Sequence, residues 1–86
     1  MIMDKDLIQS SFDDNRLEEV LALLGDSDDA WSLYMKGRVA WKQGRRSEAI
    51  SLYCRASALD PSGPATVALD QARTIMDFYN KDMYNP

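Results

Sequence analysis

The fold of this chain is decided by residues 33–61, which read LYMKGRVAWKQGRRSEAISLYCRASALDP. In the second half of this stretch, apolar residues recur at spacings of three and four, which predicts a helix over residues 47–59. A second helix is predicted over residues 29–43, and Gly44 ends it because the left-handed C′ position favours glycine. Only about three residues separate the two helices, so they must fold back as an antiparallel hairpin.

Capping residues are expected at the starts of both helices. Ser47 is the predicted N-cap of the helix over residues 47–59, and Asp28 or Asp29 is the predicted N-cap of the helix before it. Pro61 disfavours helical geometry at the residue before it and cannot continue a helix itself.

The rest of the chain also follows helical spacing. Amphipathic segments cover residues 4–11, 16–24 and 64–80, with Pro64 at a first helical position where proline is tolerated. No segment shows the sustained two-residue alternation of a strand. The sequence therefore predicts an all-α protein of about five antiparallel helices.

Small and aromatic residues in the hairpin keep a regular register. Going along the chain, the positions are Gly37, Ala49, Tyr53, Ala56 and Pro61. This ladder resembles the glycine, alanine, aromatic, alanine and proline pattern of a tetratricopeptide repeat. The resemblance implies antiparallel hairpins stacked in a right-handed superhelical array, with the small residues allowing close packing of the helices. It also implies a non-catalytic protein-binding function.

Three positions depart from the family pattern, all in the first helix of the hairpin. Leu33 stands where the family usually has tryptophan, Lys36 replaces a leucine, and Ala40 replaces a tyrosine. The departures leave the architecture better specified than the mode of binding.

The register divides the chain into units within a single domain, residues 1–86. Residues 15–20 stand where residues 44–49 stand in the full repeat at 29–61, so residues 4–25 resemble a degenerate repeat with a shorter second helix. Residues 64–80 would be a capping helix and residues 81–86 a tail. The final stretch looks like the tail of small stand-alone bacterial tetratricopeptide proteins.

Composition excludes several classes of function. The chain has no histidine and one cysteine, Cys54, so internal disulfides and the usual acid–base, nucleophile and zinc sites are ruled out. We therefore expect no enzyme, no cofactor and no metal. The net charge of −4 argues against nucleic-acid binding, and no apolar run is long enough for a membrane span. Without a signal peptide, the expected location is the cytoplasm.

Charge is unevenly distributed along the chain. Residues 1–30 carry nine acids and two bases, for a net −7, whereas residues 31–58 carry six bases and one acid, for a net +5. The two regions could attract each other, within one molecule or between two copies of a homodimer. The alternative is that both signs lie on ordinary solvated helix faces.

The resemblance also implies a candidate binding face. Tetratricopeptide repeats present the inner face of their first helices to a peptide, which here would expose Tyr34, Arg38, Trp41 and Lys42. Arg38 and Lys42 lie one turn apart, so both heads can reach one carboxylate of a protein or peptide partner. The alternative is that they pair with acids of the first hairpin, namely Asp4, Asp6, Asp13 or Asp14.

Two further hypotheses concern apolar residues. Phe78, Tyr79, Met83 and Tyr84 could anchor a partner or a second copy, or could fold back over the open end of the bundle. A rival function is a small regulatory bundle that holds a small apolar ligand in a cavity lined by Trp31, Met35 and Trp41.

Overall fold

A computed structural model describes the backbone of residues 4–84 and the side chains of residues 4–75. Within this range the chain is helical and has no strand, which confirms the predicted all-α class. The helices are α1 (Lys5–Asp13), α2 (Leu17–Leu24), α3 (Ala30–Lys42), α4 (Arg46–Leu59) and α5 (Pro64–Tyr84). Seven of the eight bounds of the first four helices lie within one residue of the expected ranges, and α1 ends two residues later than expected. Helix α5 continues four residues past the predicted end at 80.

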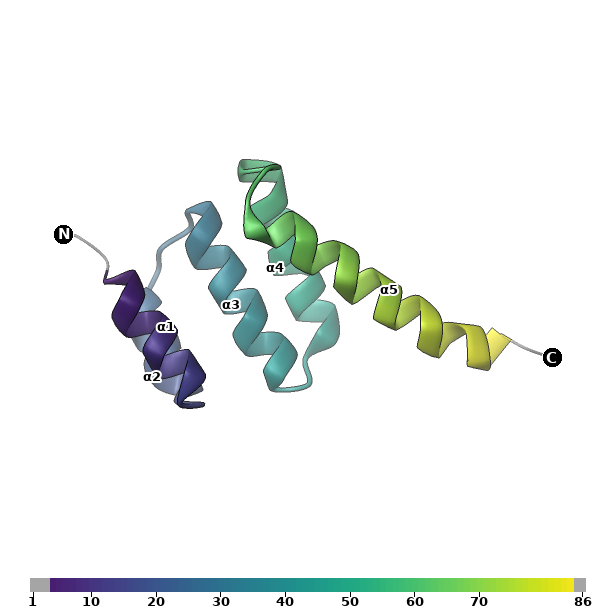
Figure 1. The fold of residues 1–86 in the computed structure, drawn as a ribbon, viewed down its shortest axis with the longest axis horizontal. Helices are drawn as coiled ribbons and strands as arrows, with labels where there is room; N and C mark the ends of the chain where they lie inside the picture. Colours follow the sequence, from purple (N-terminus) through teal and green to yellow (C-terminus); the bar gives the residue numbers. More distant parts are fainter. Residues whose placement is uncertain (1–3, 85–86) are drawn as a thin grey trace.

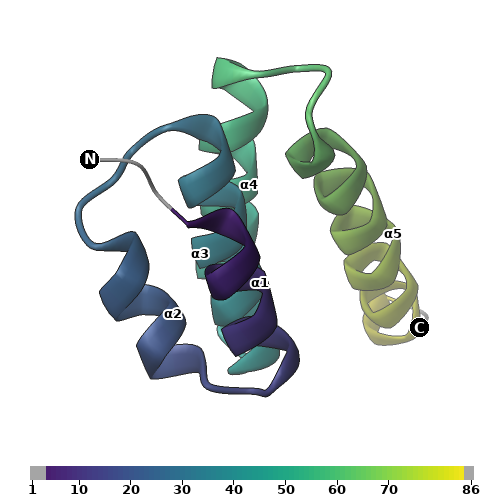
Figure 2. The same ribbon diagram turned by 60° about the vertical axis from the view of Figure 1, so that its left-hand side comes forward.

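The helices form two layers in an elongated molecule of 53 × 26 × 18 Å. Figure 1 shows α1, α3 and α5 in the near layer, with α2 behind α1 and α4 behind α3 and α5. The second view shows α1 with α2 and α3 with α4 as antiparallel hairpins, with α5 crossing beside the second hairpin (Figure 2). The far half of α5 extends beyond the other helices (Figure 1).

Helix α3 is the centre of the packing because it contributes to every core cluster. Met35 and Val39 pack with α1 and α2, Ala40 packs with α4 and α5, and Leu33 packs with the other ends of α4 and α5. Tyr34 is half-buried and contacts all three clusters. A helix that is covered on most of its surface fixes the positions of its neighbours, so α3 sets the geometry of both layers.

The turns inside the two hairpins have the same backbone structure. Asn15 and Gly44 both adopt positive φ, at 63° and 83°, in the left-handed region that favours glycine and tolerates asparagine. The next residues then donate equivalent hydrogen bonds, Arg16 N–H to the Ser11 carbonyl and Arg45 N–H to the Ala40 carbonyl, each at 2.9 Å. The two turns therefore share a backbone conformation and a hydrogen-bond pattern.

One predicted cap is wrong and one is confirmed. Helix α4 begins at Arg46, so Ser47 lies within its first turn, and Arg45 at the N-cap makes no side-chain capping bond. The reason is that the Arg45 N–H donates to the Ala40 carbonyl, and this turn geometry starts α4 at Arg46. At the start of α3, the Asp29 carboxylate accepts bonds from the Ser32 N–H and hydroxyl at 3.3 and 2.7 Å. These bonds, led by the hydroxyl, lower the pKa of Asp29.

The close approach of α3 and α4 depends on Gly37. A Cβ atom at this position would lie 2.6 Å from Cε1 and 2.7 Å from Cδ1 of Tyr53. The Tyr53 ring is only 5% exposed and lies against Tyr34, with ring centroids 6.1 Å apart. Burial raises the pKa of the Tyr53 hydroxyl to about 12. Ala49 and Ala56 of α4 are likewise buried, and Pro61 follows the end of α4 on the surface.

Candidate functional site

Two cationic side chains of α3 converge on one aromatic ring of α1. The Arg38 guanidinium carbon lies 4.1 Å from the centroid of the Phe12 ring, and the Lys42 ammonium nitrogen lies 4.6 Å from it. Both distances are within the range of a cation–π interaction. The predicted neighbours Arg38 and Lys42 are therefore brought together, on the layer formed by α1, α3 and α5.

Other contacts fix Arg38 more tightly than Lys42. Arg38 Nη1 donates a hydrogen bond to Gln9 Oε1 at 3.2 Å, and its guanidinium carbon lies 5.6 Å from the centroid of the Tyr34 ring. Arg38 is half-buried, while Lys42 is exposed. We call the set of Gln9, Phe12, Tyr34, Arg38 and Lys42 the cation–aromatic site.

The two members of this site on α1, Gln9 and Phe12, are not among the binding residues predicted from the sequence. A signal for Phe12 was present: the register that matches Asn15 to Gly44 also matches Phe12 to Trp41, which was predicted to lie on the binding face. Gln9 had no such signal, because its role depends on the approach of Arg38 from a helix far along the sequence.

The cations of the site have no carboxylate partner among the described side chains of residues 4–75. Three ion pairs are present in that range, Asp14 with Arg16, Glu19 with Arg16, and Glu48 with Arg45. Of the aspartates expected as partners, Asp4 caps α1 and Asp13 accepts a bond from Gln9. The alternative in which the first hairpin neutralises Arg38 and Lys42 is therefore not observed in the described chain.

Trp41 lies on the adjacent flank of α3, which faces α5. It lines a cleft of about 140 Å³ together with Tyr53, Ala68, Gln71, Ala72 and Ile75. The Arg46 guanidinium carbon lies 5.2 Å from the Trp41 ring centroid, and Ile75 is 40% exposed at the edge of this cleft. We call this the Trp41 cleft. The predicted binding face therefore has a cationic part over Phe12 and an apolar part that faces α5.

Trp31 and Met35 do not join Trp41 in one cavity. Trp31 lines a separate cleft of about 150 Å³ near the starts of α3 and α5, with the Lys5 ammonium 5.1 Å from its ring centroid. Met35 is fully buried in the cluster between α1, α2 and α3. Small-molecule sites are usually about 300–1,000 Å³, so neither cleft favours the rival apolar-ligand function.

The other candidate features add little to the site. The predicted tail contacts of Phe78, Tyr79, Met83 and Tyr84 lie outside the described side chains. Cys54 is half-buried and accepts a long contact from Arg73 Nη2 at 3.9 Å. Among the described residues, no group of three or more His, Cys, Asp and Glu is placed to hold a metal ion. No helix in that part of the chain has the length and apolar character needed to cross a membrane.

Comparison of the chain with protein-family models, with curated proteins and with solved structures gave no significant match.

Proposed function

We propose that the protein is a non-catalytic interaction module that binds an acidic segment of a protein on the layer formed by α1, α3 and α5. The observation that carries the proposal is the position of Arg38 and Lys42, both held over the Phe12 ring. Neither cation has an ion pair within the described chain.

An aromatic ring is well suited to hold cations for a ligand. It attracts a positive charge without neutralising it, so the guanidinium and ammonium groups keep their capacity to donate to a carboxylate. The hydrogen bond from Arg38 to Gln9 further limits the rotamers of Arg38 before any ligand arrives. Such preorganisation reduces the entropy lost on binding.

The Trp41 cleft adds an apolar contact beside the cations. Trp41 and Lys42 are neighbours in sequence at the end of α3, and Ile75 of α5 provides exposed apolar surface at the cleft. A ligand segment that combines carboxylates with one apolar side chain would use both parts. This arrangement favours an acidic, amphipathic segment as the ligand over a segment that carries only charged side chains.

The repeat architecture also supports an interaction module. The equivalent turns at Asn15 and Gly44 and the close packing of Gly37 on Tyr53 support a tetratricopeptide-like pair of hairpins. We propose that α1–α2 is a degenerate unit, α3–α4 a full unit and α5 a capping helix. Repeat proteins of this kind use one face of stacked helices for binding.

The test is fluorescence anisotropy with two labelled peptides, one that alternates glutamate with leucine and one in which lysine replaces every glutamate. We expect the acidic peptide to bind and the basic peptide not to bind. The double variant Arg38→Glu/Lys42→Glu should weaken acidic-peptide binding at least about tenfold, which corresponds to about 1.4 kcal/mol.

The matched control is Arg55→Glu, which changes an exposed arginine on α4, in the other layer. It should leave the affinity unchanged. Equal binding of both peptides, or equal loss in the control and the double variant, would contradict a specific site and indicate general charge attraction.

A further inference from the structure

We infer that the acidic segment bound by this face is the outward surface of α2 in a second copy of the chain. The inference rests on the proposed function, because it names the occupant of the same site. It commits to a self-associating protein in which the basic middle of one copy meets the acidic first hairpin of another.

The outward surface of α2 combines acids with an apolar centre. Glu18 and Glu19 are exposed in its first turn, Leu23 is 39% exposed, and Asp26 is exposed just after its end. Glu19 and Leu23 are four residues apart within α2, so they lie on one face about 6 Å apart along the helix axis, and Asp26 follows just beyond the C-cap at Gly25. This is the amphipathic, acidic pattern that the site and the Trp41 cleft would accept.

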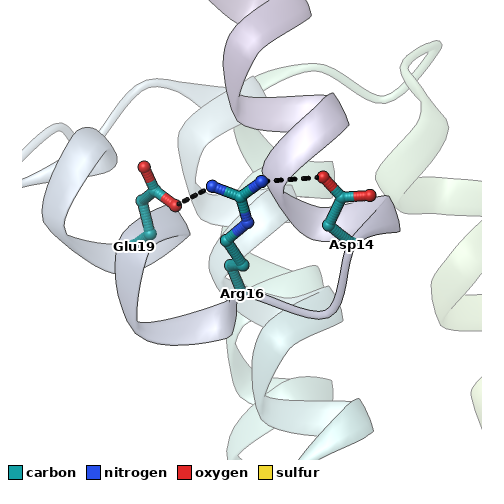
Figure 3. Close-up of polar contacts among 3 residues, drawn as sticks. All are labelled: Asp14, Arg16 and Glu19. Carbon is teal, nitrogen blue, oxygen red and sulfur yellow. Dashed lines mark hydrogen bonds and ion pairs between the residues drawn. The ribbon is translucent and has the colours of Figure 1, made fainter.

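The ion pairs of the first hairpin leave part of this surface unneutralised. Arg16 is shared between Asp14 at 3.1 Å and Glu19 at 3.3 Å, as Figure 3 shows. Glu18 and Asp26 form no ion pair among the described residues. Within residues 1–30 the two bases therefore cannot balance the nine acids.

Leucine is a suitable size for the Trp41 cleft. The cleft measures about 140 Å³, and an apolar cavity of about 150 Å³ holds a benzene molecule. Leu23 would therefore fit the cleft, and the exposed acids of this surface would then lie near the cations beside the cleft. Lys42 adjoins Trp41 in sequence and is exposed, so it is available to these carboxylates.

The contact must be between molecules because of how α2 packs. Val20 and Leu24 face inward and are buried against α1 and α3, so the exposed face of α2 points away from its own α3. Figure 2 shows α2 on the opposite side of the molecule from α5, which provides one wall of the Trp41 cleft. Only a second copy can place this surface of α2 in the cleft.

The test is sedimentation equilibrium of the full chain at about 20 mM and about 500 mM salt, where the Debye length falls severalfold. We expect a reversible dimer at low salt whose dissociation constant rises at least tenfold at high salt. Lys42→Glu alone and Glu18→Lys/Asp26→Lys alone should each give monomers. An equimolar mixture of the two variants should associate again, because each reversed charge then faces its opposite.

Two matched controls carry similar charge changes outside the proposed contact. Arg55→Glu on α4 and Asp70→Lys on α5 alter exposed residues and should dimerise as the parent chain does. A parent chain that stays monomeric at low salt overturns the inference, and so does a mixture of the two variants that stays monomeric.

Anisotropy on the same samples separates this inference from the proposed function. If the parent chain is monomeric but still binds the acidic peptide, and Arg38→Glu/Lys42→Glu loses that binding, self-association is overturned and the proposed function stands. If the parent chain is monomeric and binds no acidic peptide, both self-association and the proposed function are overturned. Dissociation of the dimer by the acidic peptide supports both, since the two ligands would share one site.

Discussion

Replacing Gly37 by alanine tests the packing that holds α3 against α4. The new Cβ would lie 2.6 Å from Tyr53 Cε1, a distance at which one of the two groups must move. The Tyr53 ring has little freedom, since it is buried and lies against Tyr34. The substitution therefore forces the ring out of its site or the two helices apart.

Two opposing effects set the change in the free energy of unfolding caused by Gly37→Ala. Overpacking a buried site costs about 1–3 kcal/mol, and we take about 2 kcal/mol here because the clash is with the body of a ring. Alanine in place of glycine inside a helix contributes about 1 kcal/mol of stabilisation. The expected net effect of Gly37→Ala is a loss of about 1 kcal/mol in the free energy of unfolding.

The assay is urea denaturation followed by far-ultraviolet circular dichroism, carried out as a double-mutant cycle with Tyr53→Leu. Leucine removes the ring atoms that the new Cβ would meet, so Gly37→Ala should be neutral or stabilising in that background. A Gly37→Ala variant that is more stable than the parent chain by the full helix-propensity gain would refute the reasoning. Equal effects of Gly37→Ala in both backgrounds would refute it as well.

Three further predictions concern stability. Because the pKa of Tyr53 is raised to about 12, its stabilising effect is complete below pH 10 and is lost as pH rises from 10 to 12, by roughly 3 kcal/mol. Urea midpoints across this range should fall less steeply in Tyr53→Phe. At Gly44, φ is 83° and a Cβ would meet nothing within 4 Å, so Gly44→Ala should lower the free energy of unfolding by about 1 kcal/mol through the backbone alone. Gly44→Asn introduces the residue type found at Asn15 in the equivalent turn and should cost only a few tenths of a kcal/mol, as measured by thermal melts. Because the pKa of Asp29 is lowered in the fold, its contribution is present above the unfolded pKa of about 4 and is lost as pH falls through the folded value. Asp29→Ala should cost about 1 kcal/mol near pH 7 and progressively less in acid, and a constant difference between the two proteins would contradict the capping role.

The helices of this protein could be predicted from sequence because local chemistry determines them. Apolar spacing located each helix, and Gly44 marked the turn that its positive φ requires. Ser47 was misassigned for a reason that is also local: capping preference favours serine, but the bond from Arg45 to Ala40 starts the helix earlier. Boundary errors of one residue at such turns are expected when backbone bonds rather than side chains set the start.

The candidate site could be predicted only in part. Spacing placed Arg38 and Lys42 one turn apart, and the structure keeps them together. It did not reveal Phe12 as the ring beneath them, nor that Trp41 faces α5. Both facts depend on which helices become neighbours in space, and periodicity within one helix contains no such information.

The stacking of the helices has a consequence for how the molecule opens. Close packing joins mostly helices that are consecutive in the chain, with α1–α3 and α3–α5 as additional pairs, so contacts are mostly local in sequence. Such chains fold fast and open from their ends in partial steps. We expect amide hydrogens of α3 and α4 to exchange most slowly, because these helices have neighbours on both sides, and those of α1 to exchange much sooner. A partner bound across α1 and α3 would stabilise the end of the molecule that opens first. Slower amide hydrogen exchange in α1 would therefore report binding.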